Sequence, residues 1–514
     1  MSRRALACAV AVITASSLLG ACDGDGRRTS ARRDPASTSS APASSSSSST
    51  STTSTTLAPP PPLAWHPCGA YQCATLTVPL DYAHAGGRTI GVAVIRHPAG
   101  DPAHRIGSLV LDPGGPGESG LALIGRDLGL LPPRVRSRFD VVELDPRGVG
   151  QSGAIRCSGG SGGDGGGGGA PGPDPAPSTP PAIEQVVRAN AGYAQLCAAA
   201  AGPLLGHVGS VDVARDLDQL RRALGDAQLT YVGLSYGTLL GATYADLFPT
   251  HVRALALDGA IDPARSMYDL QVDEARAFED ALNGFFSACV PGCGWRPSGD
   301  PTAALLALFD RLRAHPLPAG AGKQAGPDEL YLAIVSRLYS PSRRGSLASA
   351  LAAAERGDGG PIRSLADAYE GRTPGATINA DASNSINCLD HPVPRDAGAL
   401  AAQAAGAAKV APVFGPILVW GGIVCAVWPA LPTREPHPVH APGAPPIVVV
   451  GTTRDPVTPY PWAQALAGEL EHGVLLTRDG STHVALFSSG CVRATLDAYL
   501  VDLHPPAPGT VCSS

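Results

Sequence analysis

A serine lies at the centre of a glycine-bounded turn, Gly233-Leu-Ser235-Tyr-Gly237. The run at residues 229–232 before it predicts a short strand, and residues 238–248 after it predict a helix. A serine between a strand and a helix is held on a strained bend, where a base can reach its hydroxyl, and glycines allow the strand and helix to approach closely. The pattern therefore predicts that Ser235 is a nucleophile.

The same five-residue pattern also occurs around Ser161, at residues 159–163. The chain has 62 glycines in 514 residues, so chance matches to G-x-S-x-G are expected. No strand-forming run precedes Ser161 and no apolar helix-forming run follows it. Ser235 is therefore the candidate nucleophile and Ser161 is not.

A serine nucleophile needs a base and an acidic group that orients the base. In sheets with this kind of turn, the three residues follow in the order Ser, Asp, His. The apolar run 446–451 predicts a strand leading to Asp455, and residues 473–476 predict a strand leading to His483. These positions predict a triad of Ser235, Asp455 and His483. The alternative is that Asp455 is a turn residue, since Asp-Pro is common in turns, and that His483 is a solvated loop histidine.

The loop Pro113-Gly-Gly115-Pro-Gly117 follows another predicted strand. Its glycines allow backbone amides to approach the negative charge that develops during acyl transfer. We therefore expect the amides of Gly115 and Tyr236 to form an oxyanion hole.

The same loop also matches a dinucleotide-binding pattern, G-x-G-x-x-G over residues 115–120, with Glu143 as the acid that would bind a ribose. Pro116 has no amide to offer a pyrophosphate, which favours the oxyanion interpretation. The sequence contains no H-E-x-x-H motif and no P-loop, so we expect neither a cofactor nor a metal.

Strand-like and helix-like segments alternate along most of the chain, which predicts an α/β fold with a mostly parallel central sheet flanked by helices. Catalytic loops in such a sheet lie at the carboxyl ends of the strands. The predicted strands are residues 89–96, 108–112, 139–145, 229–232, 252–258, 446–451 and 473–476, and the predicted helices include 211–224, 238–248 and 492–503.

The alternation stops between residues 262 and 430, where alanine-rich helical segments predict an inserted helical cap. The sheet is then built from residues 63–261 and 431–514. Within the first part, residues 158–181 are rich in glycine and proline and predict a flexible surface loop.

The N-terminus has the features of an export signal. Two arginines precede an apolar run at residues 5–19, and Leu19-Gly-Ala-Cys22 follows. This pattern predicts a lipoprotein signal peptide over residues 1–21, with Cys22 lipidated, and the alternative is an ordinary cleaved signal. Residues 22–62 are mostly Ser, Thr and Pro and predict a disordered stalk. We expect an exported protein, either anchored on the outer face of the cell membrane or secreted.

Ten cysteines remain when Cys8 in the signal and Cys22 are set aside. An even number in an exported chain favours disulfides. Zinc is the alternative for the close pairs, but no second pair or nearby histidine pair completes a tetrahedral site. Neighbours in the sequence suggest the pairs Cys68–Cys73, Cys157–Cys197, Cys289–Cys293, Cys388–Cys425 and Cys491–Cys512.

The formal net charge of −6 comes from charges that form no basic patch in the sequence. This mildly acidic balance argues against nucleic acid as a partner.

Six segments together resemble a known family, the secreted α/β-hydrolase exopeptidases of actinobacteria with a TAP-like C-terminal segment, which are related to prolyl iminopeptidases. The family includes a membrane-anchored mycobacterial carboxylesterase/protease. The matching segments are Asp112-Pro-Gly-Gly-Pro-Gly117, Asp145-Pro-Arg-Gly-Val-Gly150, Gly233-Leu-Ser-Tyr-Gly-Thr238, Ser385-Ile-Asn-Cys-Leu-Asp390, Asp455-Pro-Val-Thr-Pro459 and Gly480-Ser-Thr-His483.

The resemblance implies an α/β-hydrolase fold and a serine hydrolase that releases short, tripeptidyl-type peptides from free N-termini through an acyl-enzyme on Ser235. Such an exopeptidase needs an acid for the substrate amine, and Asp390 is the candidate. The chain departs from the family pattern at Asp112, where Asn is common, at Glu118, where Gly is common, and at Ser481-Thr482, where Gly usually precedes the histidine. A carboxylesterase or lipase with the same triad is the alternative function. A non-catalytic binding protein is disfavoured by the intact triad.

Overall fold

The computed structural model describes residues 59–157, 170–289, 294–370 and 379–513. The predicted signal peptide, Cys22, most of the predicted stalk and Ser161 lie outside these residues.

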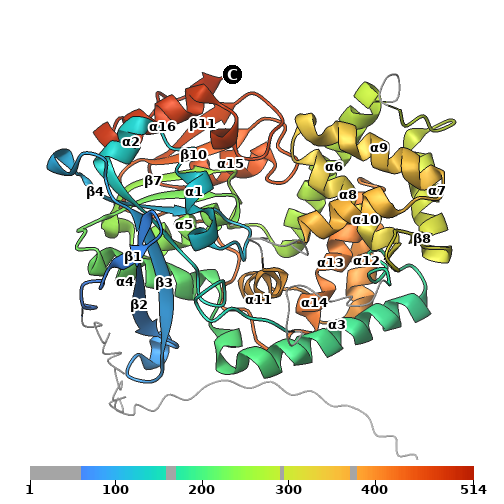
Figure 1. The fold of residues 1–514 in the computed structure, drawn as a ribbon, viewed down its shortest axis with the longest axis horizontal. Coiled ribbons are helices and arrows are strands. Elements are labelled where there is room, and N and C mark those ends of the chain that lie inside the picture. The colour runs from blue at the N-terminus through green and yellow to red at the C-terminus, as the bar shows by residue number, and fades with distance from the viewer. Residues whose placement is uncertain (1–58, 158–169, 290–293, 371–378, 514) are drawn as a thin grey trace, which may run out of the picture. The chain divides into compact units, whose positions relative to one another are not determined.

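A ten-stranded sheet forms the core (Figure 1). The strands β1, β2, β3 and β5 pair antiparallel in turn, and every later neighbouring pair is parallel. The mostly parallel sheet that the sequence predicts is therefore confirmed. In sheet order the strands are β1 (His66–Cys68), β2 (Tyr71–Pro79), β3 (Thr89–His97), β5 (Phe139–Leu144), β4 (Gly107–Asp112), β6 (Leu229–Leu234), β7 (Val252–Asp258), β10 (Ile447–Thr452), β11 (Gly473–Arg478) and β12 (Val511–Cys512).

Helices cover both faces of this sheet, because successive side chains of a strand point to opposite sides. On β6, Tyr231 packs with α4, α5 and α15, whereas Val232 and Leu234 pack with α1, α2 and α16. The two apolar layers hold the strands rigidly from both sides, which fixes the loops at their carboxyl ends. The helices are α1 (Gly120–Asp127), α2 (Pro133–Arg138), α4 (Ser210–Ala223), α5 (Tyr236–Leu247), α15 (Tyr460–Glu469) and α16 (Gly490–Asp502).

A helical cap is inserted between β7 and β10, where the sequence predicts it (Figure 1). Its apolar core joins residues of α6 to α10 with α13. The inserted elements are α6 (Met267–Cys289), α7 (Pro301–Ala314), α8 (Pro327–Leu338), α9 (Arg344–Glu355), α10 (Gly360–Tyr369), α11 (Ala380–Asp390), α12 (Ala397–Ala407), α13 (Phe414–Gly421), α14 (Ile423–Ala426) and the two short strands β8 (Leu317–Pro318) and β9 (Gln324–Ala325).

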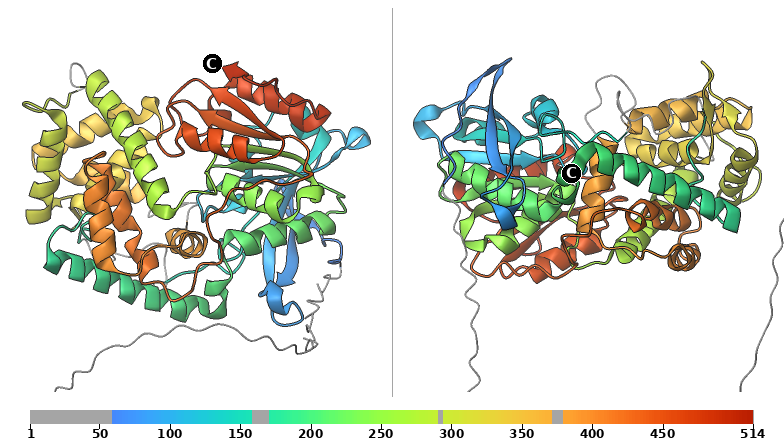
Figure 2. Two further views of the ribbon diagram at one scale, coloured as in Figure 1. Left: turned by 180° about the vertical axis from the view of Figure 1, so that it is seen from behind. Right: turned by 90° about the horizontal axis from the view of Figure 1, so that it is seen from below.

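The long helix α3 (Pro180–Ala201) is not predicted from the sequence, and it packs on this cap although it precedes β6 in the chain (Figure 2). Val186 belongs to the same apolar cluster as residues of α12, α13 and α14. The predicted flexible loop at residues 158–181 is therefore too long, since α3 begins at Pro180. Its described part is also fixed to the cap, because the Gly172 amide donates to Glu329 at 3.0 Å.

Among the described residues, no single helix is long and apolar enough to cross a membrane. One bent pair, Pro180–Gly206 with Ser210–Ala223, meets the requirement by length and composition only.

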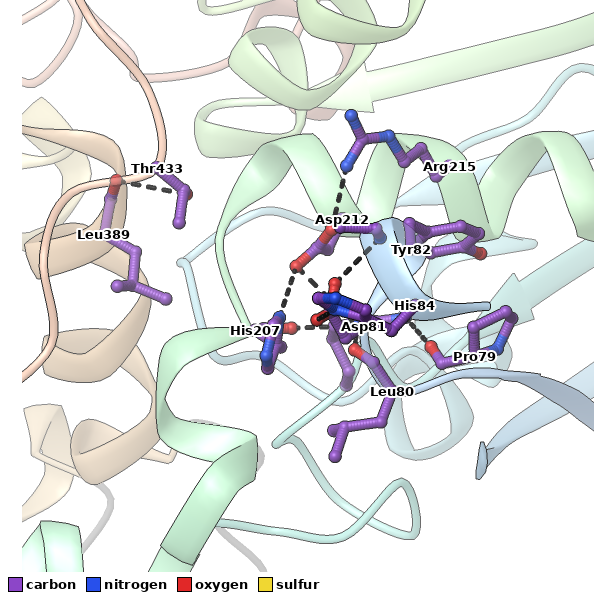
Figure 3. Close-up of polar contacts among 12 residues, drawn as sticks. Pro79, Leu80, Asp81, Tyr82, His84, His207, Asp212, Arg215, Leu389 and Thr433 are labelled. Atoms are coloured by element: carbon purple, nitrogen blue, oxygen red, sulfur yellow. Dashed lines mark hydrogen bonds and ion pairs between the residues drawn. The ribbon is translucent and has the colours of Figure 1, made fainter. Parts of the chain in front are cut away.

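The motif Asp145-Pro-Arg147 has a structural role in joining the β2–β3 hairpin to α4. Arg147 is fully buried and its guanidinium donates to both carboxylate oxygens of Asp216 on α4, at 2.6 and 2.7 Å. It also donates to the carbonyls of Leu80 and His207, at 2.9 and 3.0 Å. Next to the ion pair of Arg147 and Asp216, Asp212 accepts a hydrogen bond from the His207 imidazole at 3.3 Å (Figure 3). Removing either partner of such a buried pair leaves an uncompensated charge, so the motif stabilises the fold.

Four of the five predicted disulfides are present, and the fifth, Cys289–Cys293, lies outside the described side chains. They join residues that are 5 to 40 positions apart in the chain. The bonded pairs are Cys68–Cys73, Cys157–Cys197, Cys388–Cys425 and Cys491–Cys512. These cysteines are therefore not available as thiolate ligands for zinc.

Candidate active site

The structure brings together the serine, histidine and aspartate that the sequence places after three separate strands. Ser235 follows β6, Asp455 follows β10 and His483 follows β11. The Ser235 hydroxyl lies 3.0 Å from Nε2 of His483. On the other side of the ring, Nδ1 lies 3.0 Å from each carboxylate oxygen of Asp455. This arrangement can pass a proton from the hydroxyl to the imidazole and stabilise the resulting positive charge.

Ser235 occupies the sharp bend between β6 and α5, with a φ of 56°. Its two glycine neighbours are required by close contacts. A Cβ atom at Gly233 would lie 2.3 Å from the carbonyl oxygen of Gly237, and one at Gly237 would lie 2.8 Å from Oδ1 of Asp112. Neither contact is possible for a larger residue, so both glycines are needed to hold Ser235 above the sheet.

Asp455 is 2 % exposed and is held by three donors besides His483. The amides of Val457 and Thr458 donate to it at 2.9 and 3.1 Å, and the Thr458 hydroxyl donates at 3.1 Å. Burial alone would raise the pKa of Asp455, but the charge and hydrogen bond of His483 and the two amides outweigh it and lower the pKa. Asp455 is therefore ionised and fixes Nδ1 of His483 as the donor, which leaves Nε2 free to accept the serine proton.

Asp258, at the end of β7, connects the nucleophile to the histidine loop, a role that the sequence analysis missed. Its carbonyl accepts a hydrogen bond from the Ser235 amide at 2.9 Å. Its carboxylate accepts from the amides of Ala485 and Leu486, at 3.0 and 2.7 Å, just after His483. Asp258 is fully buried, and burial raises its pKa to about 6. The sequence feature that could have revealed this role is an acidic residue at the end of a predicted strand, directly before the inserted cap.

The glycine-rich loop after β4 passes directly over the bend that carries Ser235. A Cβ atom at Gly114 would lie 3.2 Å from the amide nitrogen of Tyr236. Tyr236 is the first residue of α5, so its amide has no acceptor within that helix. The Gly114 amide donates to Asp112 at 2.8 Å, whereas no hydrogen bond between described residues uses the amide of Gly115. Both predicted oxyanion donors are thus without an acceptor among the described residues, and their role as an oxyanion hole stays a prediction.

Glu143, the acid that the dinucleotide interpretation needs, is fully buried on β5. Neither of its carboxylate oxygens has a hydrogen-bond partner among the described residues, and burial raises its pKa well above the ordinary value. A ribose could not reach this side chain, so the dinucleotide interpretation is wrong.

Asp112 is a second buried carboxyl group, directly beneath the glycine-rich loop. It is 4 % exposed, and burial raises its pKa to about 7, although the Gly114 amide acts in the opposite direction. The charges of Glu118 and Asp127 raise the pKa further. Asp112 is thus neutral at acidic pH and carries an unfavourable charge at alkaline pH.

Asp112→Asn should therefore stabilise the protein at pH 8. The folded-state pKa of about 7 lies above the unfolded value of 3.8, so the wild type loses stability as the pH rises between these values. Asparagine keeps the shape without the charge, and we expect a gain of about 1–3 kcal/mol in the free energy of unfolding at pH 8. Denaturant unfolding at pH 8 and pH 4 measures it, with Asp280→Asn, which removes an exposed carboxylate, as the control. A gain of equal size at both pH values would contradict the electrostatic explanation.

The prediction that Asp390 binds a substrate amine is wrong. Asp390 is fully buried, and its Oδ1 accepts from the amide and hydroxyl of Ser210 at 2.7 and 2.8 Å. Its other oxygen accepts from the Tyr236 hydroxyl at 2.7 Å. The side chain therefore connects α11 to α4 and to the residue after Ser235. The sequence could not show this, because it does not reveal which way the cap helix α11 turns.

A different carboxylate of the cap, Glu274 on α6, lies close enough to Tyr339 and Asp455 to interact electrostatically with both. Phe278 lies one turn further on the same face of α6 and packs 6.3 Å from the ring of Tyr339. The Tyr339 ring in turn meets the His483 imidazole edge-on, with centroids 5.5 Å apart. Glu274 is half-buried and forms no hydrogen bond or ion pair with any described residue. Burial raises its pKa to about 8, and the charge of Asp455 raises it further.

Comparison with known proteins agrees with this fold. A family model described as "alpha/beta hydrolase fold" matches residues 107–306, and one described as "TAP-like protein" matches residues 411–512. Serine protease Hip1 of Mycobacterium tuberculosis is 36% identical over 477 residues, which cover 87% of this chain and 90% of that protein. Carboxylesterase B of the same organism is 35% identical, covering 86% of each chain. Tripeptidyl aminopeptidase of Streptomyces lividans is 30% identical, covering 87% of this chain and 86% of that protein.

The similarity extends over both halves of the sheet and the inserted cap, because each alignment spans more than 460 residues. The chain therefore belongs to the TAP-like α/β-hydrolase family and is a serine hydrolase.

Proposed function

We propose that this protein is an exopeptidase that releases short, tripeptidyl-type peptides from free N-termini. Ser235 is the nucleophile, His483 the general base and acid, and Asp455 the residue that orients His483. The proposal depends on one observation above all, the continuous hydrogen-bonded series from the Ser235 hydroxyl through His483 to Asp455. The relatives named as a serine protease and as a tripeptidyl aminopeptidase support peptide bonds as the substrate.

In the first step, the Ser235 oxygen attacks the carbonyl carbon of the substrate while its proton moves to Nε2 of His483. The carbonyl oxygen becomes negatively charged and accepts hydrogen bonds from the amides of Gly115 and Tyr236. The carbon–nitrogen bond then breaks, and the leaving amine takes the proton from His483. Water, deprotonated by His483 in the same way, attacks the acyl-enzyme, releases the peptide acid and regenerates the Ser235 hydroxyl.

Recognition of a free N-terminus requires a negative group near the triad, and Glu274 suits this role. Its carboxylate is half-buried beside the aromatic rings that contact His483. A cation there would form a charge-assisted hydrogen bond with the carboxylate and would interact favourably with the faces of the tyrosine rings. An arriving ammonium would also stabilise the ionised form of Glu274, against the effect of burial on its pKa.

Glu274→Gln should reduce kcat/KM for tripeptide anilides with a free amine by about 10–100-fold, because a charge-assisted bond is replaced by a neutral one. The N-acetylated anilides, which carry no positive charge, should be hydrolysed at an unchanged rate. Steady-state kinetics on both series measures the difference, and Asp269→Asn, an exposed acid on the same helix, is the control. An equal loss on both series would show that Glu274 does not bind the amine.

A carboxylesterase with the same triad is the second candidate, favoured by the relative named Carboxylesterase B. The two activities share their chemistry and differ in the group that the pocket accepts. Hydrolysis of free-amine tripeptide anilides and of short acyl esters should be compared with the same preparation. Turnover of the esters alone would reject the exopeptidase proposal.

We also propose that the protein is exported and lipidated at Cys22. The N-terminal sequence and the four disulfides of the described residues support export, because disulfides persist mainly outside reducing compartments. Mass spectrometry of the mature N-terminal peptide tests it, and an unmodified Cys22 would contradict lipidation.

A further inference from the structure

A groove crosses the boundary between the cap and the sheet-containing core on the outer side of the triad. It has a volume of about 750 Å³. One wall is the face of α6 that carries Asp273, Arg276 and Asp280, and the opposite wall is the loop after β10 that carries Arg454 and Asp455. Ser481, two positions before His483, also lines it, so the groove is bordered by both segments that supply the acid and the base. Volumes of this size accommodate ligands of several hundred daltons.

The groove carries charges of both signs, and most of its arginines are paired with carboxylates. Four arginines line it, against three carboxylates, one of which is Asp455 and is bound to His483. Arg265 and Arg276 both pair with the carboxylate of Asp273, at 3.0 and 3.3 Å, and Arg265 also pairs with Asp262 at 3.5 Å. Arg454 pairs with Asp479 at 3.0 Å.

The fourth arginine, Arg344, is not paired with any carboxylate of the described residues. It lies at the first residue of α9 and forms no ion pair within the described part of the chain. Its Nε is buried and has no hydrogen-bond partner among the described residues. Burial, unopposed by any carboxylate, lowers its pKa. Asp280 lines the same groove without bonding to Arg344, and it weakens the positive potential there.

A buried guanidinium nitrogen without a partner is costly, and a carboxylate is the group that relieves this cost best, because it accepts two parallel N–H bonds from one arginine. Under the proposed exopeptidase reaction, the part of the substrate after the cleaved bond must extend away from the triad, and this groove adjoins the triad.

We propose that this arginine-lined groove binds acidic side chains of peptide substrates on the C-terminal side of the cleaved bond. The inference depends on the proposed exopeptidase function, and it adds a substrate class: peptides whose N-terminal tripeptide is followed by Asp or Glu. Arg344 is the residue that determines this preference, and Asp280 limits it.

The test uses three substrates with the same N-terminal tripeptide. One is the tripeptide anilide, and two are decapeptides continued either with Asp and Glu or with Asn and Gln. The wild type should cleave the acidic decapeptide about tenfold more efficiently than the neutral one, with the difference decreasing at high salt. Arg344→Ala should abolish the difference, Arg344→Glu should reverse it, and Asp280→Asn should increase it. Arg343→Ala, which removes the same charge from the exposed neighbouring residue, should leave it unchanged.

Unchanged hydrolysis of the tripeptide anilide by the Arg344 variants shows that the fold and the triad are intact. Equal rates on the two decapeptides with the wild type, or an equal preference in Arg344→Ala, would overturn the inference while leaving the exopeptidase proposal standing. If the anilide is not hydrolysed at all, the proposed function fails, and the groove is then judged by direct binding. In that case Ser235→Ala should bind a fluorescent acidic decapeptide at least about tenfold more tightly than the neutral one, and equal affinities would reject the groove as an acidic-peptide site.

Discussion

Replacing Ser235 by alanine should lower kcat/KM by about 10⁴–10⁶-fold, because the hydroxyl that forms the acyl-enzyme is removed while binding and the oxyanion donors remain. The same variant should lose covalent labelling by a fluorophosphonate probe, which reacts with the activated serine. The hydroxyl lies 3.0 Å from Nε2 of His483, which is close enough for the imidazole to take its proton. Hydrolysis of a tripeptide anilide and mass spectrometry of the labelled protein measure the two effects.

Ser161→Ala is the matched control, since Ser161 has the same local sequence pattern without the strand before it. This variant should keep both activity and labelling. Undiminished labelling of the Ser235→Ala protein at any other serine would reject the assignment of the nucleophile.

Asp455→Asn should lower kcat by about 10³–10⁴-fold with a much smaller change in KM. The asparagine is of similar size, but it offers one acceptor oxygen where the carboxylate offers two. It also cannot stabilise the positive charge that forms on His483. Because four described donors converge on this carboxylate, the neutral amide also leaves some of them without an acceptor. Fluorophosphonate labelling should be slowed in proportion to kcat.

Asp479→Asn is the control for this prediction, since Asp479 is an exposed acid between the strand β11 and His483 that bonds to Thr453. Its activity should stay within about twofold of the wild type. A comparable loss in both variants would mean that the acid of the triad has been misassigned, or that any change in this loop displaces His483.

The strands and helices around the site could be predicted because the apolar pattern of each is local. Three of the predicted strands are confirmed with small changes at their ends: 252–258 as β7, 108–112 as β4 and 473–476 as β11. Helix α3 and strand β2 were missed for different reasons. The helix follows a run of glycine and proline and buries few of its residues. The strand was overlooked although residues 74–78 alternate between buried apolar residues and exposed threonines.

The positions of the three triad residues could be predicted because each follows a recognisable strand and the order along the chain is constrained. The acid proposed to bind a substrate amine could not be predicted, because its position depends on how the cap helices are oriented. Asp390 and Glu274 are both acids in cap helices, and only the structure shows that the first is bonded to Ser210 and Tyr236 while the second lies near Tyr339. The groove likewise depends on tertiary contacts between residues that are more than 150 positions apart.

The bonds made by Asp258 have a consequence for how substrates enter. Its backbone and its side chain attach the loops of Ser235 and His483 to the end of one strand of the sheet. The cap also holds His483, because the His483 amide donates a hydrogen bond to the Tyr339 carbonyl at 3.1 Å and the Tyr339 ring packs on the imidazole. A cap movement that makes room for a large substrate would therefore release His483 from Tyr339, while the bonds of Asp258 would keep the loops of the nucleophile and the base joined.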